Sequence, residues 1–271
     1  MLGFLLSLRL WQLTVVILGL AFLIGLGFSV GMRKAFRLNP TTEQADLAID
    51  LMQVTSTYIG ILLAFAGVLA WQDSRDASTA VESEAGVISL LYRDLTAYGT
   101  QMDPARDALK DYVHSVVYDA WPLLREGKRS PVTEAKLLVV FDRVAAVSPR
   151  DEREAAIFRE TFSQLNQLVS MRRERIAASR AQIPPVLWVV AVLGSILTVA
   201  YAAAFVSSRY ALLMMSGTSL TIGLLFLFLL SVEYPFRNRN GITSEPFVEL
   251  ASIFDKIDHS PKSLKAKPSP R

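Results

Sequence analysis

The amino-acid sequence predicts an all-α membrane protein with four transmembrane helices and a cytoplasmic helical bundle that extends from the second and third. The 271 residues are 52% hydrophobic although 20% are charged. The apolar residues are concentrated in four runs, at about 10–32, 52–71, 185–206 and 210–232. Each run is close to the ~20 residues that cross a bilayer core. None of the four runs contains Asp, Glu, Lys, Arg or His, so we interpret all of them as membrane spans.

The composition excludes several classes of function. The chain has no cysteine, which rules out disulfides, thiolate zinc sites and cysteine nucleophiles. Its two histidines, His114 and His259, form no metal-binding or catalytic motif, and there is no glycine-rich phosphate loop or dinucleotide fingerprint. A net charge of +3 is too small to indicate nucleic-acid binding. We therefore predict no enzymatic activity, no cofactor and no metal site.

Positive charges near the ends of the spans predict the orientation. One side of the membrane carries Arg9, Arg75, Arg172, Arg173, Arg175, Arg180, Arg237 and Arg239. The other side carries Arg33, Lys34, Arg37 and Arg209. The excess of eight over four places both termini and the large domain in the cytoplasm, with the protein in the cell membrane.

These assignments divide the chain into five segments. Residues 1–71 hold the first two spans, and residues 72–183 form the cytoplasmic bundle. Residues 184–236 hold the third and fourth spans, followed by a turn and a short amphipathic helix over 237–258. The turn is indicated by Asn240-Gly241, and the basic tail 259–271 has the composition of a disordered segment.

The second span is expected to begin a single long helix that continues into water. No proline occurs from Thr41 to Asp103, and Thr41 and Gln44 have capping-box spacing. Within the span, four small residues recur on one face: Ser56, Gly60, Ala64 and Gly67. Such a stripe either packs against a neighbouring helix or lines a narrow pore. Packing is the simpler interpretation, and the pore is the alternative.

Two heptad patterns predict that this helix packs antiparallel against the last helix of the bundle. The first contains Ala77, Val81, Glu84, Ile88, Leu91, Leu95 and Tyr98. The second contains Phe158, Phe162, Leu165, Val169, Arg172, Ile176, Ser179 and Ile183. Each pattern includes one charged residue, and counting along both helices from the membrane matches Glu84 with Arg172. We predict a buried pair that sets the register. Alternatively, both side chains lean out of the seam and stay hydrated.

Small polar residues before proline predict where the other bundle helices begin. Asp103-Pro104 begins a helix to about Glu126 that Pro122 kinks or ends, and Ser130-Pro131 begins the next. Ser148-Pro149 begins the last one, which is expected to run to Ile183. Ser244-Glu245-Pro246 begins the short amphipathic helix.

Several short motifs together resemble the bacterial bestrophin-like family, a membrane domain of unknown function. They are Glu84-Ala85, Leu91-Tyr92-Arg93-Asp94, Arg172-Arg173, Ile183-Pro184, Leu187-Trp188, Glu233-Tyr234-Pro235-Phe236 and Ser244-Glu245-Pro246-Phe247. The sharpest is the exit motif after the fourth span, Glu233 to Phe236, with its second Pro-Phe at Pro246 and Phe247. Here Glu233 stands where the family pattern leads us to expect Asp.

The resemblance implies four spans, cytoplasmic termini and a pentameric anion channel, without assigning any pore residue. Our leading hypothesis is an oligomeric bestrophin-like channel in the lipid bilayer that passes small anions. The absence of ionisable side chains within the spans argues against proton-coupled carriers and cation pumps. The alternative is a non-conducting membrane scaffold whose bundle binds a partner, and a third possibility is a regulator of cell-envelope processes.

Overall fold

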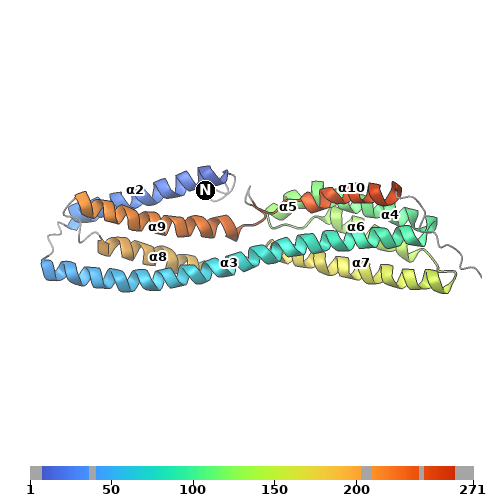
Figure 1. Cartoon of the computed structure of the whole chain (residues 1–271), viewed down its shortest axis with the longest axis horizontal. Helices are drawn as coiled ribbons and strands as arrows, with labels where there is room; N and C mark the ends of the chain where they lie inside the picture. Colours follow the sequence, from blue (N-terminus) through green and yellow to red (C-terminus); the bar gives the residue numbers. More distant parts are fainter. Residues whose placement is uncertain (1–7, 37–40, 203–208, 238–240, 260–271) are drawn as a thin grey trace, which may run out of the picture. The chain divides into compact units, whose positions relative to one another are not determined.

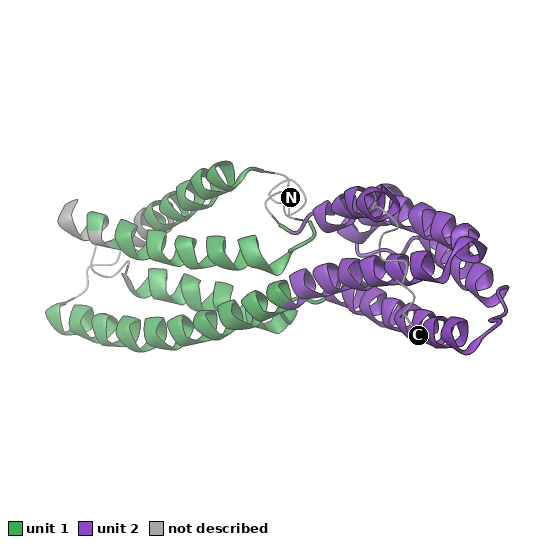
Figure 2. Cartoon of the chain, turned by 45° about the vertical axis from the view of Figure 1, so that its right-hand side comes forward, with its two compact units in different colours: residues 1–75, 181–241 green, residues 76–180, 242–271 purple. Residues whose placement is uncertain are grey.

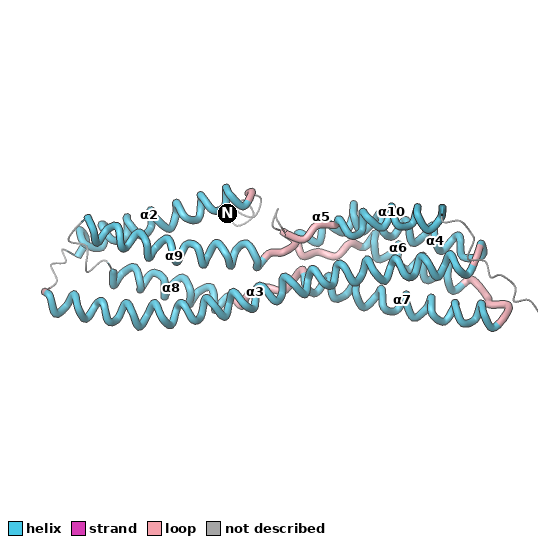
Figure 3. The backbone as a smooth tube through the Cα atoms, in the orientation of Figure 1, coloured by secondary structure: helices cyan, strands magenta, loops and turns pink. Residues whose placement is uncertain are grey.

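The computed structural model describes residues 8–36, 41–202, 209–237 and 241–259, and these are almost entirely helical without strands. Figure 1 shows the helices α2 to α10, and Figure 3 shows the loops that join them. The chain forms two compact units. Unit 1 comprises residues 1–75 and 181–241, and unit 2 comprises residues 76–180 and 242–271 (Figure 2).

The helix α3 spans Thr42–Tyr98, 57 residues without a break, and contributes to both units. The predicted continuity through Trp71 is therefore confirmed. Its N-terminus forms the predicted capping box: the Thr41 amide donates to Gln44 Oε1 at 3.1 Å, and the Gln44 amide donates to Thr41 Oγ1 at 3.4 Å. The helix ends at Gly99, whose φ of 116° is accessible mainly to glycine.

Unit 1 is built from α2 (Leu10–Phe36), the first part of α3, α8 (Pro185–Ala202) and α9 (Arg209–Glu233). The helix α2 packs along α9, and α8 contacts both of them. A hydrophobic core joins α3 and α8 with α9. It contains Ile59, Leu63, Ala66, Ala70, Ile183, Ala191 and Leu229. The Ile59 side chain of α3 packs directly on Gly194 of α8, where an added Cβ atom would overlap it.

Among the residues that the structure describes, three helices are long and apolar enough to cross a membrane: Leu10–Gly27 of α2, a segment of α3, and Met215–Glu233 of α9. A shorter apolar stretch, Pro185–Tyr201 of α8, covers most of the predicted third span. The last residues of that span, 203–206, and the residues between the third and fourth spans, 207–208, lie outside the described residues. The same is true of Asn240 in the predicted turn and of the tail from residue 260 onward.

Unit 2 contains the second part of α3, together with α4 (Asp103–Ser115), α5 (Trp121–Arg125), α6 (Pro131–Ala145), α7 (Glu152–Ala178) and α10 (Glu245–His259). All seven residues of the heptad predicted on α3 are buried. The helix α7 runs antiparallel beside this part of α3: the Tyr98 hydroxyl donates to Glu154 Oε2 at 3.4 Å near one end, and Glu84 contacts Arg175 near the other. The predicted antiparallel pair of helices is thus present.

Two predicted helix boundaries are wrong. The helix α7 begins at Glu152, not after Ser148-Pro149, because the Asp151 side chain caps it by accepting from the Glu154 amide at 2.7 Å. It ends at Ala178 instead of reaching Ile183, and a turn at Ser179 and Arg180 follows. Pro184 disfavours helical backbone at Ile183 itself.

The helix predicted to begin at Asp103 does begin there, but its regular α form is interrupted by a π-helical turn over Val116–Ala120. This turn immediately precedes Trp121 and Pro122. Because proline has no backbone N–H to donate, a wider turn before it allows the chain to continue as α5. Pro122 therefore does not end the helix, which continues as α5 to Arg125.

Candidate functional site

A groove in unit 1 brings together hydroxyl side chains from three helices. It has a volume of about 360 Å³ and is lined by Ser56 and Gly60 from α3, Thr198 from α8, and Thr218 and Thr221 from α9. Apolar residues complete its walls: Ile59, Leu63, Ile222 and Leu225. We call this feature the hydroxyl groove. Ser56 and Thr221 are exposed in the single chain, whereas Thr198 is buried.

The predicted small-residue stripe of α3 separates into two environments. Ser56 and Gly60 line the hydroxyl groove, and a Cβ added at Gly60 would meet nothing within 4 Å. Gly67 is instead in a packing position, because an added Cβ would lie 2.9 Å from the Phe228 ring. Ala64 is exposed and lies outside the groove. The stripe therefore combines a groove-lining part with a packing part.

Three groove hydroxyls have a defined hydrogen-bond direction. Ser56 Oγ donates to the Gln53 carbonyl at 3.1 Å, Thr198 Oγ1 to that of Gly194 at 2.9 Å, and Thr221 Oγ1 to that of Gly217 at 3.0 Å. A hydroxyl has one proton to donate, so in this arrangement these groups offer the groove their acceptor lone pairs. To contact an anion, each hydroxyl must rotate and release its carbonyl, at a cost of about 0.5–1.5 kcal/mol per hydrogen bond.

A charged cluster lies in the core of unit 2. Glu84 of α3 and Arg175 of α7 are both almost fully buried, and Arg175 Nε lies 2.5 Å from Glu84 Oε2. Arg175 Nη2 also donates to Glu84 Oε1 at 3.2 Å, so the pair is bidentate. The buried Tyr112 hydroxyl of α4 donates to the same Oε1 at 2.8 Å. The carboxylate thereby links three helices.

The predicted partner of Glu84 is wrong. Arg172 is buried but lies 3.9 Å from Glu134 of α6, and Glu84 pairs with Arg175, one helical turn further on. The prediction assumed that α7 is helical up to Ile183 and measured the distance to Arg172 from there. Because α7 ends at Ala178, that distance was wrong. The buried face of α7 overlaps the predicted heptad only in part. Leu165, Arg172 and Ile176 are buried as the heptad predicts, and Thr161, Gln164, Leu168 and Arg175 are buried outside it.

The surroundings of the cluster favour a charged Arg175 and a neutral Tyr112. Burial opposes the charge of Arg175, but the Glu84 carboxylate and Tyr112 raise the pKa of this guanidinium above its ordinary value. Burial, and then the Glu84 charge, raise the pKa of the Tyr112 phenol well above its ordinary value. Tyr112 therefore stays a neutral O–H donor to the carboxylate. This is the chemistry of a structural ion pair rather than of an acid–base catalyst.

Aromatic rings surround the guanidinium of Arg175. Its Cζ lies 5.9 Å from the centre of the Trp121 ring and 5.5 Å from that of Phe247, both within cation–π range. The two rings contact each other edge to face at 5.9 Å. Phe247 belongs to the predicted exit motif, so this part of the motif completes the charged core of unit 2.

The rest of the exit motif has structural roles near the helix ends. In unit 1, the Trp188 indole donates to the buried Glu233 Oε1 at 2.9 Å, which joins α8 to the end of α9. Tyr234 is half-buried, and Pro235 and Phe236 are buried. In unit 2, the Ser244 carbonyl accepts from the Phe247 amide at 3.0 Å, and Pro246 occupies the first turn of α10.

A second cluster in unit 2 was not predicted from the sequence. Asp258, near the end of α10, accepts from the Tyr92 hydroxyl at 2.9 and 2.8 Å, from Lys110 Nζ at 3.0 Å, and from Arg106 Nη2. The Tyr92 ring stacks on Phe254 of α10 with centroids 4.0 Å apart. Tyr92 was noted within a family motif, but only the folded arrangement connects it with Asp258, 166 residues away.

The described part of the chain contains no group of three or more His, Asp or Glu side chains placed to hold a metal ion. No site described above combines a nucleophile with a base. The hydroxyl groove can solvate a small ion or water molecules, and the two clusters of unit 2 hold helices together.

The comparisons with known proteins agree with this architecture. The family model of the Bestrophin-like domain matches residues 12–247. The fold is similar to a crystal structure described as that of a membrane protein, with a TM-score of 0.62 and 15% sequence identity. That similarity covers 90% of this chain and 97% of the other. A search of curated protein sequences finds no match.

Proposed function

Because the chain belongs to the bestrophin-like family, we propose that this membrane protein is an oligomeric channel that passes small anions. The observation that carries the proposal is the hydroxyl groove in the unit that contains the apolar helices. Serine and threonine side chains from three helices converge there. The four apolar runs contain no Asp, Glu, Lys, Arg or His, so an ion within them would depend on uncharged polar groups such as these hydroxyls.

The exposure of the groove supports an oligomer. Ser56 and Thr221 are exposed in the single chain, where a monomer would present them and the open space at Gly60 to lipid. Additional copies around this face would enclose the groove and allow it to hold water. In this proposal, the protein acts without catalysis, and unit 2 and both termini lie in the cytoplasm of the cell.

The direction of the hydroxyl hydrogen bonds defines how an anion would be accommodated. Each hydroxyl must give up its hydrogen bond to a helix carbonyl before it can donate to the anion. We therefore expect anion binding to be weak and easily reversed. Weak binding suits conduction, because an ion must leave a site as readily as it enters.

The test is anion flux through purified protein in liposomes that contain a chloride- or iodide-quenched dye. We expect flux above that of empty vesicles, and a reduced flux for Thr221→Val, which removes a groove hydroxyl. The matched control is Thr57→Val, because Thr57 is exposed and donates to the Gln53 carbonyl at 2.8 Å but does not line the groove. Absence of flux, or equal flux in both variants, would remove this proposal.

A second candidate function is a scaffold that binds a partner through unit 2. The observation that favours it is an apolar groove of about 420 Å³ between α4 and α10. Its wall includes Tyr118 and Val248, whose exposed fractions are 65% and 54%. The scaffold would be supported by two results together. The protein would show no anion flux, and Val248→Asp would abolish binding of a partner whereas Val132→Asp, on the exposed face of α6, would not.

A further inference from the structure

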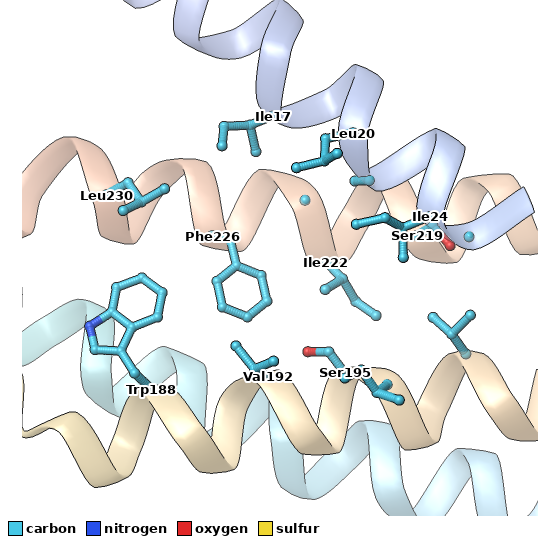
Figure 4. A pocket seen from close by; sticks show the side chains of 15 residues that line it. Ile17, Leu20, Ile24, Trp188, Val192, Ser195, Ser219, Ile222, Phe226 and Leu230 are labelled. Carbon is cyan, nitrogen blue, oxygen red and sulfur yellow. The ribbon is translucent and has the colours of Figure 1, made fainter. Parts of the chain in front are cut away.

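We propose that unit 1 binds one acyl chain of a membrane phospholipid in an apolar pocket between α2, α8 and α9. The pocket has a volume of about 370 Å³. Figure 4 shows Ile17, Leu20 and Ile24 of α2 on one side, Trp188, Val192 and Ser195 of α8 on another, and Ile222, Phe226 and Leu230 of α9 between them. We call it the acyl pocket. It is separate from the hydroxyl groove except for Ile222, which contributes to both.

The length of the acyl pocket matches one leaflet of a bilayer. Its lining on α8 extends from Trp188 to Val199, which at the rise of an α-helix is about 17 Å. The hydrocarbon core of a bilayer is about 30 Å thick, so one leaflet contributes about 15 Å. An acyl chain lying along α8 would therefore span the pocket from end to end.

The chemistry of the lining fits a hydrocarbon chain and not a polar ligand. Thirteen of the fifteen lining residues are apolar or glycine, and Ser195 and Ser219 are the exceptions. The Ser195 hydroxyl donates to the Ala191 carbonyl at 2.7 Å, so its proton is already used. With two hydroxyl side chains among fifteen lining residues, the surface of the pocket is predominantly apolar.

The polar features at one end of the acyl pocket suit a lipid headgroup. Trp188 lines that end, and its indole N–H donates to Glu233 at the last residue of α9. Tryptophan is enriched where hydrocarbon meets the headgroup layer. The exposed Arg237, whose guanidinium lies 5.7 Å from the centre of the Tyr234 ring, follows this end in sequence and could reach a lipid phosphate.

The spacing of the helices favours an acyl chain over a helix from a second copy. The helix α8 contacts both α2 and α9 within unit 1. A helix with its side chains is about 10–12 Å across and would have to separate these contacts, whereas a single hydrocarbon chain is much thinner. In a bilayer, lipid acyl chains surround the protein, so a chain that fills this pocket is always available from the neighbouring lipid.

The experiment uses the full chain reconstituted in vesicles with a phosphatidylcholine that carries a diazirine at the middle of one acyl chain. After illumination, labelled residues are located by mass spectrometry. We expect label on the pocket-lining residues of α8 and α9, and a severalfold loss of that label in Val192→Trp, which fills the pocket. The matched control is Val189→Trp, because Val189 is 55% exposed on α8 but does not line the pocket.

Labelling of the exposed Leu213 and Leu224 of α9 provides the internal standard for correct folding and insertion. If pocket residues are labelled no more than these two, or if Val192→Trp leaves the pocket label unchanged, the acyl pocket is overturned. Pocket residues that cross-link to a second copy instead of lipid would overturn it as well. The proposal does not depend on conduction, since the labelling can succeed in a protein that passes no ions.

Discussion

At the residue scale, the bidentate contact between Glu84 and Arg175 makes unit 2 sensitive to single charge changes. We predict that Glu84→Gln lowers the free energy of unfolding of unit 2 by about 3–5 kcal/mol, because it leaves the guanidinium of Arg175 buried without a counter-charge. The measurement is chemical unfolding of the purified protein in detergent, followed by the fluorescence of Trp121 within the cluster.

The control for this prediction is Arg172→Gln. Arg172 faces Glu134, whose side chain is 55% exposed, at 3.9 Å, so its loss should cost much less than that of Glu84. The double variant Glu84→Arg with Arg175→Glu should recover part of the stability lost by either single change. If Glu84→Arg with Arg172→Glu recovers more, the assignment of Arg175 as the partner is wrong.

Gly86 within α3 and Gly99 immediately after its last residue provide a second prediction at the residue scale. Gly99→Ala should destabilise unit 2 by about 1–3 kcal/mol, because Gly99 has φ 116° and ψ −167°, a region essentially restricted to glycine. Gly86→Ala should stabilise it by about 0.5–1 kcal/mol, because Gly86 is an exposed helical residue with open space at its Cβ. Unfolding midpoints of the two variants test both signs. Equal effects would contradict the backbone explanation.

At the scale of the elements, Asp258 fastens the end of α10 to α3 and α4. Although burial acts in the opposite direction, hydrogen bonds from Lys110 and Tyr92 and the charges of Arg106 and Lys110 lower the pKa of Asp258. Because the folded-state pKa is lowered, the charged Asp258 stabilises the docked helix at any pH above the pKa of the unfolded state, about 3.9. This stability is lost as the pH falls through the folded-state pKa.

We therefore predict that Asp258→Asn loosens α10 at neutral pH, by about 0.5–1 kcal/mol, because Asp258 is exposed and solvent screens its charged hydrogen bonds. Amide hydrogen exchange of α10 measures the change, with faster exchange expected in the variant. The difference from the wild type should disappear at a pH below the folded-state pKa of Asp258. Asp255→Asn, on an exposed residue of the same helix, should leave the exchange unchanged; an equal increase there would contradict the specific role of Asp258.

The elements also show how far sequence reasoning extends. Every position of the predicted α3 heptad from Ala77 to Tyr98 is buried, because apolar spacing directly encodes which face is buried. The heptad did not include Ala80, Ala85 and Tyr92, which are buried as well. The face of α7 was predicted less well, since Phe158 and Phe162 suggested one register whereas the polar Thr161 and Gln164 are buried. Buried polar residues carry no hydrophobic signal. For the same reason, the partner of Glu84 and the cluster around Asp258 required the structure.

At the scale of the whole molecule, the four-span count and the orientation rest on the sequence. The membrane-protein fold follows from the apolar helices and the family. The small-residue stripe could be placed on one face of α3 from its spacing. The threonines that complete the hydroxyl groove could not be predicted, because they come from α8 and α9 and no local pattern links them to Ser56.

The chain has no cysteine, so a single introduced cysteine reports its side of the membrane without background. We predict that Ser148→Cys, between α6 and α7, reacts with an impermeant maleimide in inside-out vesicles but not in right-side-out vesicles. Glu43→Cys, at the start of α3, should show the opposite pattern, because an odd number of spans between the two positions places them on opposite sides. Both residues are exposed, so reagent access is limited by the membrane alone. Reversed labelling of both would invert the orientation that the arginine distribution predicts, whereas labelling of both from one side would contradict α3 as a membrane-spanning helix.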